Sequence, residues 1–289
     1  MSATSFLLAT LLTTFGADAK DYPKAELLAE AADLAESARV LDARPRAKYE
    51  FGHIPNAVWV DYAEWSKVFD NGKDPEPWAK RIGALGIKID TPVVIYDDAN
   101  SKDAARIWWI LRFWGVKDVR LLNGGWYAWK ESGGKTVTEE PKVELTTPKL
   151  KAQDDRLATK DQVLQTLKEK SFQIIDARSE GEFCGEVKSA KKAGAIPEAR
   201  QLEWSDLIDA KTQRFKPAAE LSKLFADRGI KLDQPVTTYC QSGGRASVMA
   251  FGLELMGADK VRNYYKSWAE WGNDENTPIV IPAKTAPGK

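Results

Sequence analysis

The chain is poor in the residues that build metal sites and disulfide scaffolds. Its 289 residues include two cysteines and one histidine. Two cysteines form at most one disulfide, and with one histidine they are too few for a four-ligand Cys/His zinc site. We therefore expect no disulfide framework, no metal centre and no cofactor. Only His53 could serve as a histidine base in catalysis.

The chain also lacks an excess of charge of either sign. The 42 basic and 42 acidic side chains leave a formal net charge of zero, so nothing in the composition marks a surface for nucleic acid or for an anionic membrane. Beyond the first twenty residues, no apolar stretch approaches the length of a transmembrane helix. We expect no nucleic-acid partner and no membrane association of the mature chain.

The first nineteen residues differ from the rest. Residues 6–12 form an uncharged apolar run, and Ala17-Asp18-Ala19 fits the small-x-small pattern of a signal-peptidase site. No Lys or Arg precedes the run, so a short amphipathic N-terminal helix is the alternative. The pattern predicts a signal peptide over residues 1–19 and a periplasmic or secreted protein; without cleavage the protein would be cytoplasmic.

The remaining sequence contains an internal repeat. Residues 85–96 match residues 228–239, 143 positions later, with seven of twelve identical. Asp-Ala-Arg at 42–44 recurs at 176–178, and the pair Trp126/Trp129 recurs as Trp268/Trp271. A period above a hundred residues indicates two globular copies of one domain. The second copy carries a loop about eight residues longer after Arg178.

Each copy alternates short apolar runs with helical patterns. Residues 40–41, 93–96, 174–175 and 236–239 are expected to form buried strands, and residues 104–114 and 246–256 helices. This alternation predicts an α/β fold in which each copy is a mainly parallel sheet flanked by helices. We place the N-terminal domain at 22–135, a linker at 136–156 and the C-terminal domain at 157–280.

The two copies differ after the repeated tyrosine. The second copy continues Cys240-Gln241-Ser242-Gly243-Gly244-Arg245, whereas the first has Asp97 in the place of the cysteine. The thiol is therefore expected at the carboxyl end of a strand, where ligands bind in such sheets. Two glycines allow backbone amides to converge, and a helix start and Arg245 add positive charge, which together stabilise a thiolate. The alternative is a buried structural cysteine in a glycine-rich turn.

These motifs resemble the tandem-domain rhodanese sulfurtransferases. The likeness rests on Asp-Ala-Arg after a strand, Gly52-His53-Ile54-Pro55, the Cys240 loop, and the Trp-x-x-Trp motif near the end of each copy. It covers about residues 22–280. It implies a non-catalytic N-terminal domain, a catalytic C-terminal domain, and sulfur held on Cys240 as a persulfide. The candidate substrate-binding residues are Gln241, Ser242, Gly243, Gly244, Arg245 and Arg178. The partners are a small anionic sulfur donor and a thiophilic acceptor, and we expect a monomer.

Three alternatives accompany this hypothesis. Thiosulfate, with cyanide or a thiol as acceptor, is the first donor considered, and 3-mercaptopyruvate is the second. A cysteine-dependent phosphatase or arsenate reductase would close a Cys-x5-Arg ring, one residue larger than the spacing from Cys240 to Arg245. A non-enzymatic rhodanese-like module for binding or redox sensing would be expected to lack the cysteine or the glycines in both copies, but the second copy retains them.

Some residues depart from the family pattern. Glu182 stands where many members carry an arginine for the substrate anion, and Ala195 replaces the histidine kept at His53. A carboxylate should repel an anionic donor, so its charge must be met by Arg245, by Arg178 or by the basic insertion. The insertion lysines, Lys188, Lys191 and Lys192, are more typical of a solvated loop. Cys184, His53 and Trp268 are expected to be structural rather than catalytic.

Overall fold

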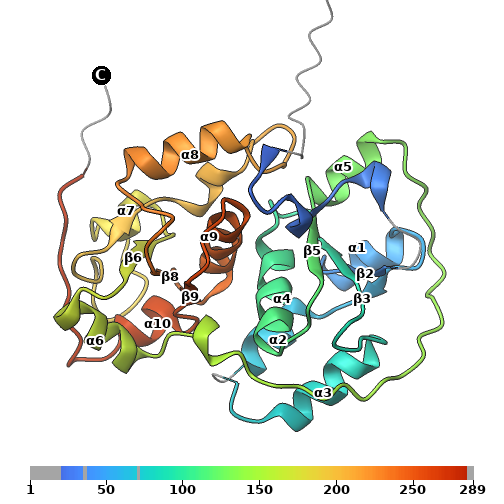
Figure 1. Cartoon of the computed structure of the whole chain (residues 1–289), viewed down its shortest axis with the longest axis horizontal. Helices are drawn as coiled ribbons and strands as arrows, with labels where there is room; N and C mark the ends of the chain where they lie inside the picture. The colour runs from blue at the N-terminus through green and yellow to red at the C-terminus, as the bar shows by residue number, and fades with distance from the viewer. Residues whose placement is uncertain (1–20, 35–37, 70–71, 285–289) are drawn as a thin grey trace, which may run out of the picture.

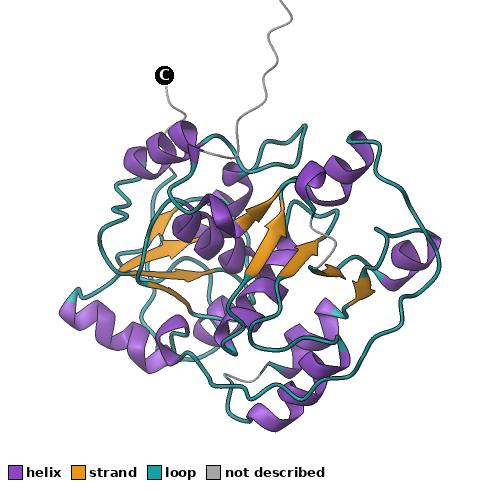
Figure 2. Ribbon diagram, turned by 45° about the vertical axis from the view of Figure 1, so that its right-hand side comes forward, coloured by secondary structure: helices purple, strands orange, loops and turns teal. Residues whose placement is uncertain are grey.

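The computed structural model describes residues 21–34, 38–69 and 72–284. The predicted signal peptide lies outside these residues. Each half of the chain forms its own sheet, and the two halves lie side by side (Figure 1). The predicted α/β class with two parallel sheets is confirmed. Helices lie on both sides of the strands (Figure 2).

The N-terminal sheet has five parallel strands in the order β1-β5-β4-β2-β3. Its strands are β1 (Leu28–Ala29), β2 (Arg39–Asp42), β3 (Val58–Trp59), β4 (Val93–Tyr96) and β5 (Val119–Leu122). The central strand β4 is buried along its length, as expected of a continuous apolar run in a sheet covered on both faces. The predicted strand at 93–96 is thus confirmed.

The C-terminal sheet repeats this arrangement with four parallel strands in the order β7-β6-β8-β9. They are β6 (Gln173–Asp176), β7 (Arg200–Gln201), β8 (Val236–Tyr239) and β9 (Val261–Asn263). Register is conserved between the copies, because Asp42 pairs with Tyr96 and Asp176 pairs with Tyr239. A single parallel bridge from Leu157 to Asn263 stands where the first copy has β1.

Helices alternate with strands in a similar order in both halves, except that α6 precedes the first strand of the C-terminal sheet. The N-terminal half contains α1 (Arg46–Phe51), α2 (Tyr62–Val68), α3 (Pro75–Ala84), α4 (Lys102–Phe113) and α5 (Gly125–Glu131). The C-terminal half contains α6 (Lys160–Glu169), α7 (Glu180–Phe183), α8 (Ala218–Asp227), α9 (Gly244–Leu255) and α10 (Ser267–Trp271). Short 3-10 helices occur at Ala25–Leu27, Ala31–Asp33, Asp154–Arg156 and Trp204–Leu207. The two helices predicted from sequence begin two residues earlier than expected.

Helices α4 and α9 form the centre of the contact between the halves (Figure 1). Both are almost wholly buried, and Trp108 of α4 packs edge-on against Phe251 of α9 at 4.9 Å between ring centroids. One cluster of buried apolar side chains runs through both halves. The two halves are therefore joined by a shared core and not only by the connecting segment.

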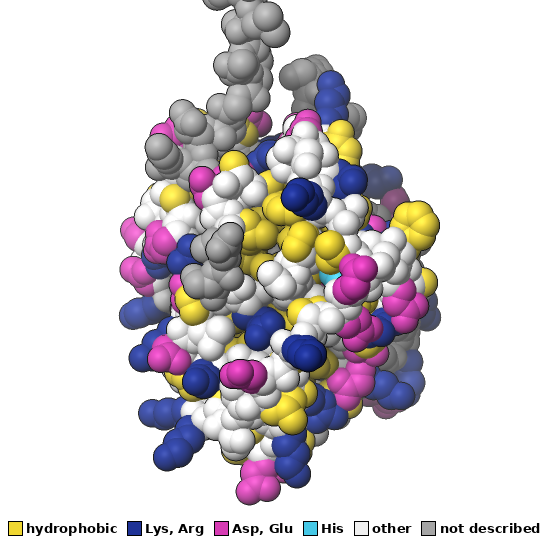
Figure 3. Space-filling model, turned by 90° about the vertical axis from the view of Figure 1, so that its right-hand side faces the viewer, with side chains coloured by type: hydrophobic (Ala, Val, Ile, Leu, Met, Phe, Trp, Pro, Cys, Tyr) yellow, Lys and Arg dark blue, Asp and Glu magenta, His cyan; other side chains and the backbone are white. Residues whose placement is uncertain are grey.

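The connecting segment lies along the N-terminal half (Figure 1). The amide of Thr146 donates to the Gly83 carbonyl, and the amide of Gln153 donates to the Phe113 carbonyl. Among the described residues, no helix combines the length and hydrophobicity needed to cross a bilayer. On the face of the N-terminal half shown in Figure 3, basic and acidic side chains are interspersed.

Candidate active site

Cys240 directly follows β8 and opens the turn into α9. Its amide donates to Ser267 Oγ at 3.0 Å, and its carbonyl accepts the Trp268 amide at 3.0 Å. The residue is 1% exposed. The first bond of α9 runs from the Ser247 amide to the Gly243 carbonyl, so the amides of residues 244–246 precede the helical hydrogen bonds and are available to an anion.

Both glycines of the turn are required by their surroundings. Gly243 has a φ of +84°, a left-handed conformation that side chains other than glycine adopt only rarely. A Cβ at Gly244 would lie 2.4 Å from Nη2 of Arg106, a residue of α4. The turn can therefore curl around the sulfur only because it lacks side chains on these two sides.

The equivalent turn of the N-terminal copy binds an anion, the Asp97 carboxylate, through its backbone amides. The Asp97 carboxylate is buried and accepts four backbone amides at 2.8–2.9 Å, from residues 99, 101, 103 and 104. Each oxygen accepts two of them, so the loop is built around the carboxylate form. Burial raises the pKa of Asp97, and the four amides counteract that effect. The first copy thus holds its own anion where the second copy presents a thiol.

Arg245, the arginine of the loop, forms a charge pair with Glu182. Its two terminal nitrogens donate to the Glu182 carboxylate at 2.6 and 2.9 Å. Glu182 in turn accepts hydrogen bonds from Ser179, which caps α7. Burial alone would raise the pKa of Glu182, but Arg245 and Ser179 lower it by more. The carboxylate expected to repel the donor therefore neutralises the loop arginine.

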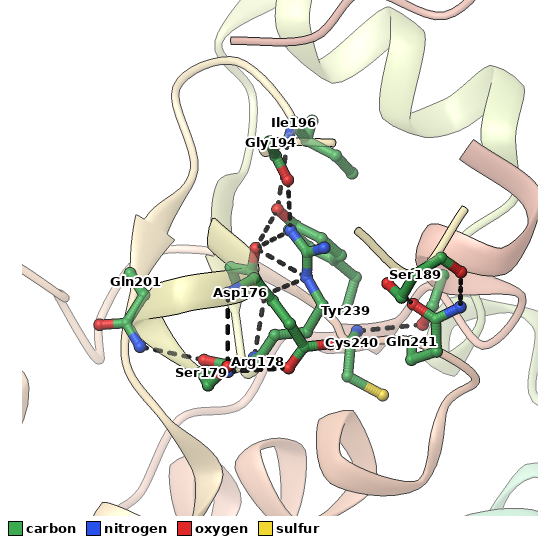
Figure 4. A network of polar contacts seen from close by, with 12 residues as sticks. Asp176, Arg178, Ser179, Ser189, Gly194, Ile196, Gln201, Tyr239, Cys240 and Gln241 are labelled. Carbon is green, nitrogen blue, oxygen red and sulfur yellow. Dashed lines mark hydrogen bonds and ion pairs between the residues drawn. The ribbon is translucent and has the colours of Figure 1, made fainter. Parts of the chain in front are cut away.

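The Arg178 side chain points away from the Cys240 sulfur (Figure 4). Its guanidinium contacts both Asp176 oxygens and donates to the Gly194 carbonyl at 2.8 Å. It stacks on Trp268 at 4.3 Å, and the Tyr239 hydroxyl donates to Asp176. Figure 4 shows this side chain directed toward Asp176 and Gly194, whereas the Cys240 sulfur points the other way.

Arg44 makes the same contacts in the first copy. It binds Asp42 and the Gly52 carbonyl and stacks on Trp126 at 3.8 Å. The two Asp-x-Arg pairs therefore secure the strand ends in the same way in both copies. A contact between Arg178 and substrate stays a prediction, and the fully buried position of its guanidinium does not favour it.

The long insertion closes over one side of the turn. Ser189 donates to Gln241 Oε1 at 2.7 Å, and Gln241 Nε2 donates to the Ser189 carbonyl at 3.1 Å (Figure 4). Lys192 is held by the Thr277 hydroxyl and carbonyl, at 2.7 and 2.6 Å, whereas Lys188 and Lys191 are exposed. The Gln241 side chain therefore anchors the insertion. Of this residue, only the backbone is left to contact a bound anion.

One residue of this region was missed by the sequence analysis. Arg106 of α4 reaches across from the N-terminal half, and its Nη1 donates to the Ser242 carbonyl at 2.8 Å. The sequence signal, an arginine within an apolar helix, was present but does not tell which helix face meets the other copy. Only the packing of α4 on α9 brings this side chain to the loop.

The remaining polar candidates are structural. His53 is buried, stacks on Tyr49 at 3.9 Å and contacts the carbonyls of Tyr49 and Glu139, as expected. Cys184 and Cys240 are both free and buried, and burial raises the pKa of Cys184. No group of three or more His, Cys, Asp or Glu side chains suited to a metal ion occurs in the described part of the chain.

Comparison with known proteins agrees with this geometry. Residues 25–132 and 159–274 match the rhodanese-like domain. The chain is 36% identical to the sulfur carrier protein TtuD of Thermus thermophilus, over 80% of this chain and 86% of that protein. It is 34% identical to a thiosulfate sulfurtransferase of Corynebacterium glutamicum, over 82% of each.

A solved structure shows the same arrangement of two domains. The crystal structure of SseA from Escherichia coli, described as a 3-mercaptopyruvate sulfotransferase with the rhodanese fold, superposes with a TM-score of 0.71 at 29% identity. The match covers 84% of this chain and 98% of SseA. Together with the repeated domain match, these relatives show that the chain belongs to the rhodanese family and carries its domain twice in tandem.

Proposed function

We propose that this protein is a sulfurtransferase that moves a sulfane sulfur through a persulfide on Cys240. The observation that carries the proposal is the loop of the first copy, in which four backbone amides hold the Asp97 carboxylate. The loop of the second copy offers similar amides around a thiol in the place of that carboxylate. Such a loop stabilises the negative charge that the sulfur carries in each step.

The reaction runs in two displacements. The Cys240 thiolate attacks the outer sulfur of thiosulfate, the sulfur–sulfur bond of the donor breaks, and sulfite leaves with the electron pair. Cyanide or a thiolate then attacks the outer sulfur of the persulfide, and the Cys240 thiolate is restored. In this scheme the amides of residues 241–245 hold the persulfide anion.

Thiosulfate is the preferred donor in this proposal. Cys240 is buried, and the insertion anchored by Gln241 covers one side of the loop, which favours a small donor. The likeness to a thiosulfate sulfurtransferase supports the same choice. The alternative donor is 3-mercaptopyruvate, favoured by the likeness to SseA. Its carbon–sulfur bond would break, and the enolate of pyruvate would leave and take up the thiol proton.

Intact-mass measurement tests the proposal. The protein is incubated with each donor, and a gain of about one sulfur mass (~32 Da) is expected, which cyanide then discharges. Cys240→Ser should show no gain, whereas the matched control Cys184→Ser should load like the native chain. Sulfur transfer by Cys240→Ser would contradict the assignment. A native chain that loads from neither donor would favour a non-enzymatic module for binding or redox sensing.

We also propose domain bounds, an oligomeric state and a cellular location for the protein. The N-terminal domain spans residues 22–135 and is non-catalytic, and a linker at 136–156 leads to the catalytic domain at 157–280. The protein is a monomer, which its mass in light scattering would test. We also propose cleavage after residue 19 and a periplasmic or secreted location, supported by the Ala17-Asp18-Ala19 pattern. An exported product that starts at Met1 or Ser2 would contradict cleavage.

A further inference from the structure

Arg106 is a buried cation without a matching anion. It belongs to α4 of the N-terminal repeat and is 8% exposed. Its Nη1 donates to three neutral oxygens, Ser66 Oγ at 2.6 Å, the Ser242 carbonyl at 2.8 Å and the Tyr265 hydroxyl at 2.9 Å. Its Nε has no hydrogen-bond partner in the described structure. A buried guanidinium is costly unless a negative charge compensates it.

The guanidinium lies against the anion-binding turn. A Cβ placed on Gly244 would be 2.4 Å from its Nη2 and 3.1 Å from its Nε. These two nitrogens therefore face the backbone of the turn that starts α9. Burial lowers the pKa of Arg106, but Tyr265, Cys240 and Asp103 together raise it by more, so the side chain remains charged.

Other charges near the loop cancel in pairs. Arg245 is matched by Glu182, and Arg178 is matched by Asp176. Asp103 lies three residues before Arg106 and interacts with it electrostatically, but its nearest cation is Lys102 at 3.8 Å. In the described residues, no carboxylate accepts a hydrogen bond from Arg106. The anion that remains for this cation is the sulfur of Cys240.

We propose that Arg106 supplies the positive charge that stabilises the Cys240 sulfur anion, so that the non-catalytic repeat completes the active site of the other. Arg106 is a positioning residue, because it holds the Ser242 carbonyl and acts on the sulfur through its charge. The inference rests on the proposed function, in which Cys240 cycles between thiolate and persulfide. It also gives a physical reason for Gly244, since any side chain there would displace the guanidinium.

The pH profile of Cys240 alkylation tests this role. Iodoacetamide is uncharged, and peptide mass separates modification of Cys240 from that of Cys184. In Arg106→Gln, the pH of half-maximal reactivity should rise by about one unit, as expected for a lost neighbouring charge. The rate at pH 7 should fall about tenfold. Arg106→Lys keeps the charge and should restore most of the reactivity.

Arg156→Gln is the matched control. Arg156 is a partly buried cation between the halves, with 14% of its side chain exposed, and it pairs with Glu254 toward the far end of α9. Its removal weakens the same interface without changing the charge at the loop, so the alkylation profile should stay native. An unchanged profile in folded Arg106→Gln, or an equal shift in Arg156→Gln, would overturn the inference.

Sulfur loading separates the two proposals. If the native chain loads sulfur from thiosulfate and Arg106→Gln loads it equally fast, this inference fails and the sulfurtransferase proposal stands. If the native chain loads from neither donor while its alkylation still depends on Arg106, the sulfurtransferase proposal fails and the charge pairing stands. Thermal unfolding of each variant establishes that the comparison is made on folded protein.

Discussion

At the scale of single residues, Glu182 shows how a neighbouring charge changes the role of a residue. Considered alone, a glutamate near an anion site is repulsive. In the structure it pairs with Arg245 and leaves the loop with no net charge from these two side chains. The backbone amides and Arg106 then carry the stabilisation of the sulfur anion.

Replacing Glu182 by Gln should therefore change both reactivity and stability. Arg245 would gain an uncompensated charge near Cys240, so we expect faster alkylation below pH 8 and a KM for thiosulfate lower by several-fold. Loss of the partly buried pair should cost about 1–3 kcal/mol in the free energy of unfolding. Steady-state kinetics and urea unfolding measure the two effects.

The pH dependence of stability follows from the same pair. The pKa of Glu182 is lowered in the folded state, so its stabilisation is present above its ordinary pKa and is lost as pH falls through the folded value. Glu182→Gln should lack this loss on acidification. Glu186, an exposed glutamate paired with Lys284, provides the control, and an effect of Glu186→Gln as large as that of Glu182→Gln would refute the explanation.

At the scale of elements, the two loop–helix units differ in the residue that starts the loop, Asp97 in the first copy and Cys240 in the second. Both helices start at a residue with positive φ, Ser101 before α4 and Gly243 before α9. The Asp97 carboxylate fills the first loop with an internal anion. The second loop has a thiol there, so a sulfur atom from outside can enter the same environment of amides.

The first turn of α4 also contains a carboxylate with an unusual environment. Burial and the charge of Asp97 raise the pKa of Asp103 to about 6. A raised carboxyl pKa favours the protonated form in the folded state, so stability is highest below its ordinary pKa and falls as pH rises through about 6.

Asp103→Asn should remove this dependence. Between pH 4 and pH 7 the native chain should lose on the order of 2 kcal/mol from this group, and the variant should not. Urea unfolding across that range measures the difference. Asp155→Asn, at an exposed site, should follow the native curve; parallel curves for all three proteins would rule out this role for Asp103.

At the scale of the whole molecule, the contact between the repeats is part of the site. Trp109 stacks on Tyr265 at 5.1 Å, and Tyr265 contacts Arg106. The Tyr22 hydroxyl donates to carbonyls of Phe215 and Lys216 across the same interface. The N-terminal repeat has Asp97 in the place of the cysteine, and its Arg106 contacts the Cys240 loop of the other repeat.

Trp108→Ala tests this coupling. The ring is fully buried and packs on Phe251 of the other repeat, so its loss should destabilise the protein by about 3–5 kcal/mol. Chemical denaturation measures the change. Phe51→Ala is the matched control, because Phe51 is 92% exposed and its loss should stay within about 0.5 kcal/mol. Equal effects would contradict a core that is shared by both repeats.

Much of this organisation could be predicted from sequence because it is local. Strand and helix periodicity depends on neighbouring residues, and an internal repeat makes two copies of each pattern visible. The strands at 93–96 and 236–239 and the turn that carries Cys240 lie where they were expected. Substitution of Cys by Asp between the copies was enough to distinguish the catalytic candidate from its counterpart.

Charge pairing and contacts between the repeats depended on tertiary structure. The pairing of Arg245 with Glu182 joins residues 63 positions apart, and the bond from Arg106 to Ser242 joins residues 136 positions apart. No periodicity links such residues, since their approach depends on how α7 and α4 pack around the turn. Sequence alone therefore determined the fold class, the repeat and the candidate nucleophile, whereas only the folded chain decided which charges lie near that thiol.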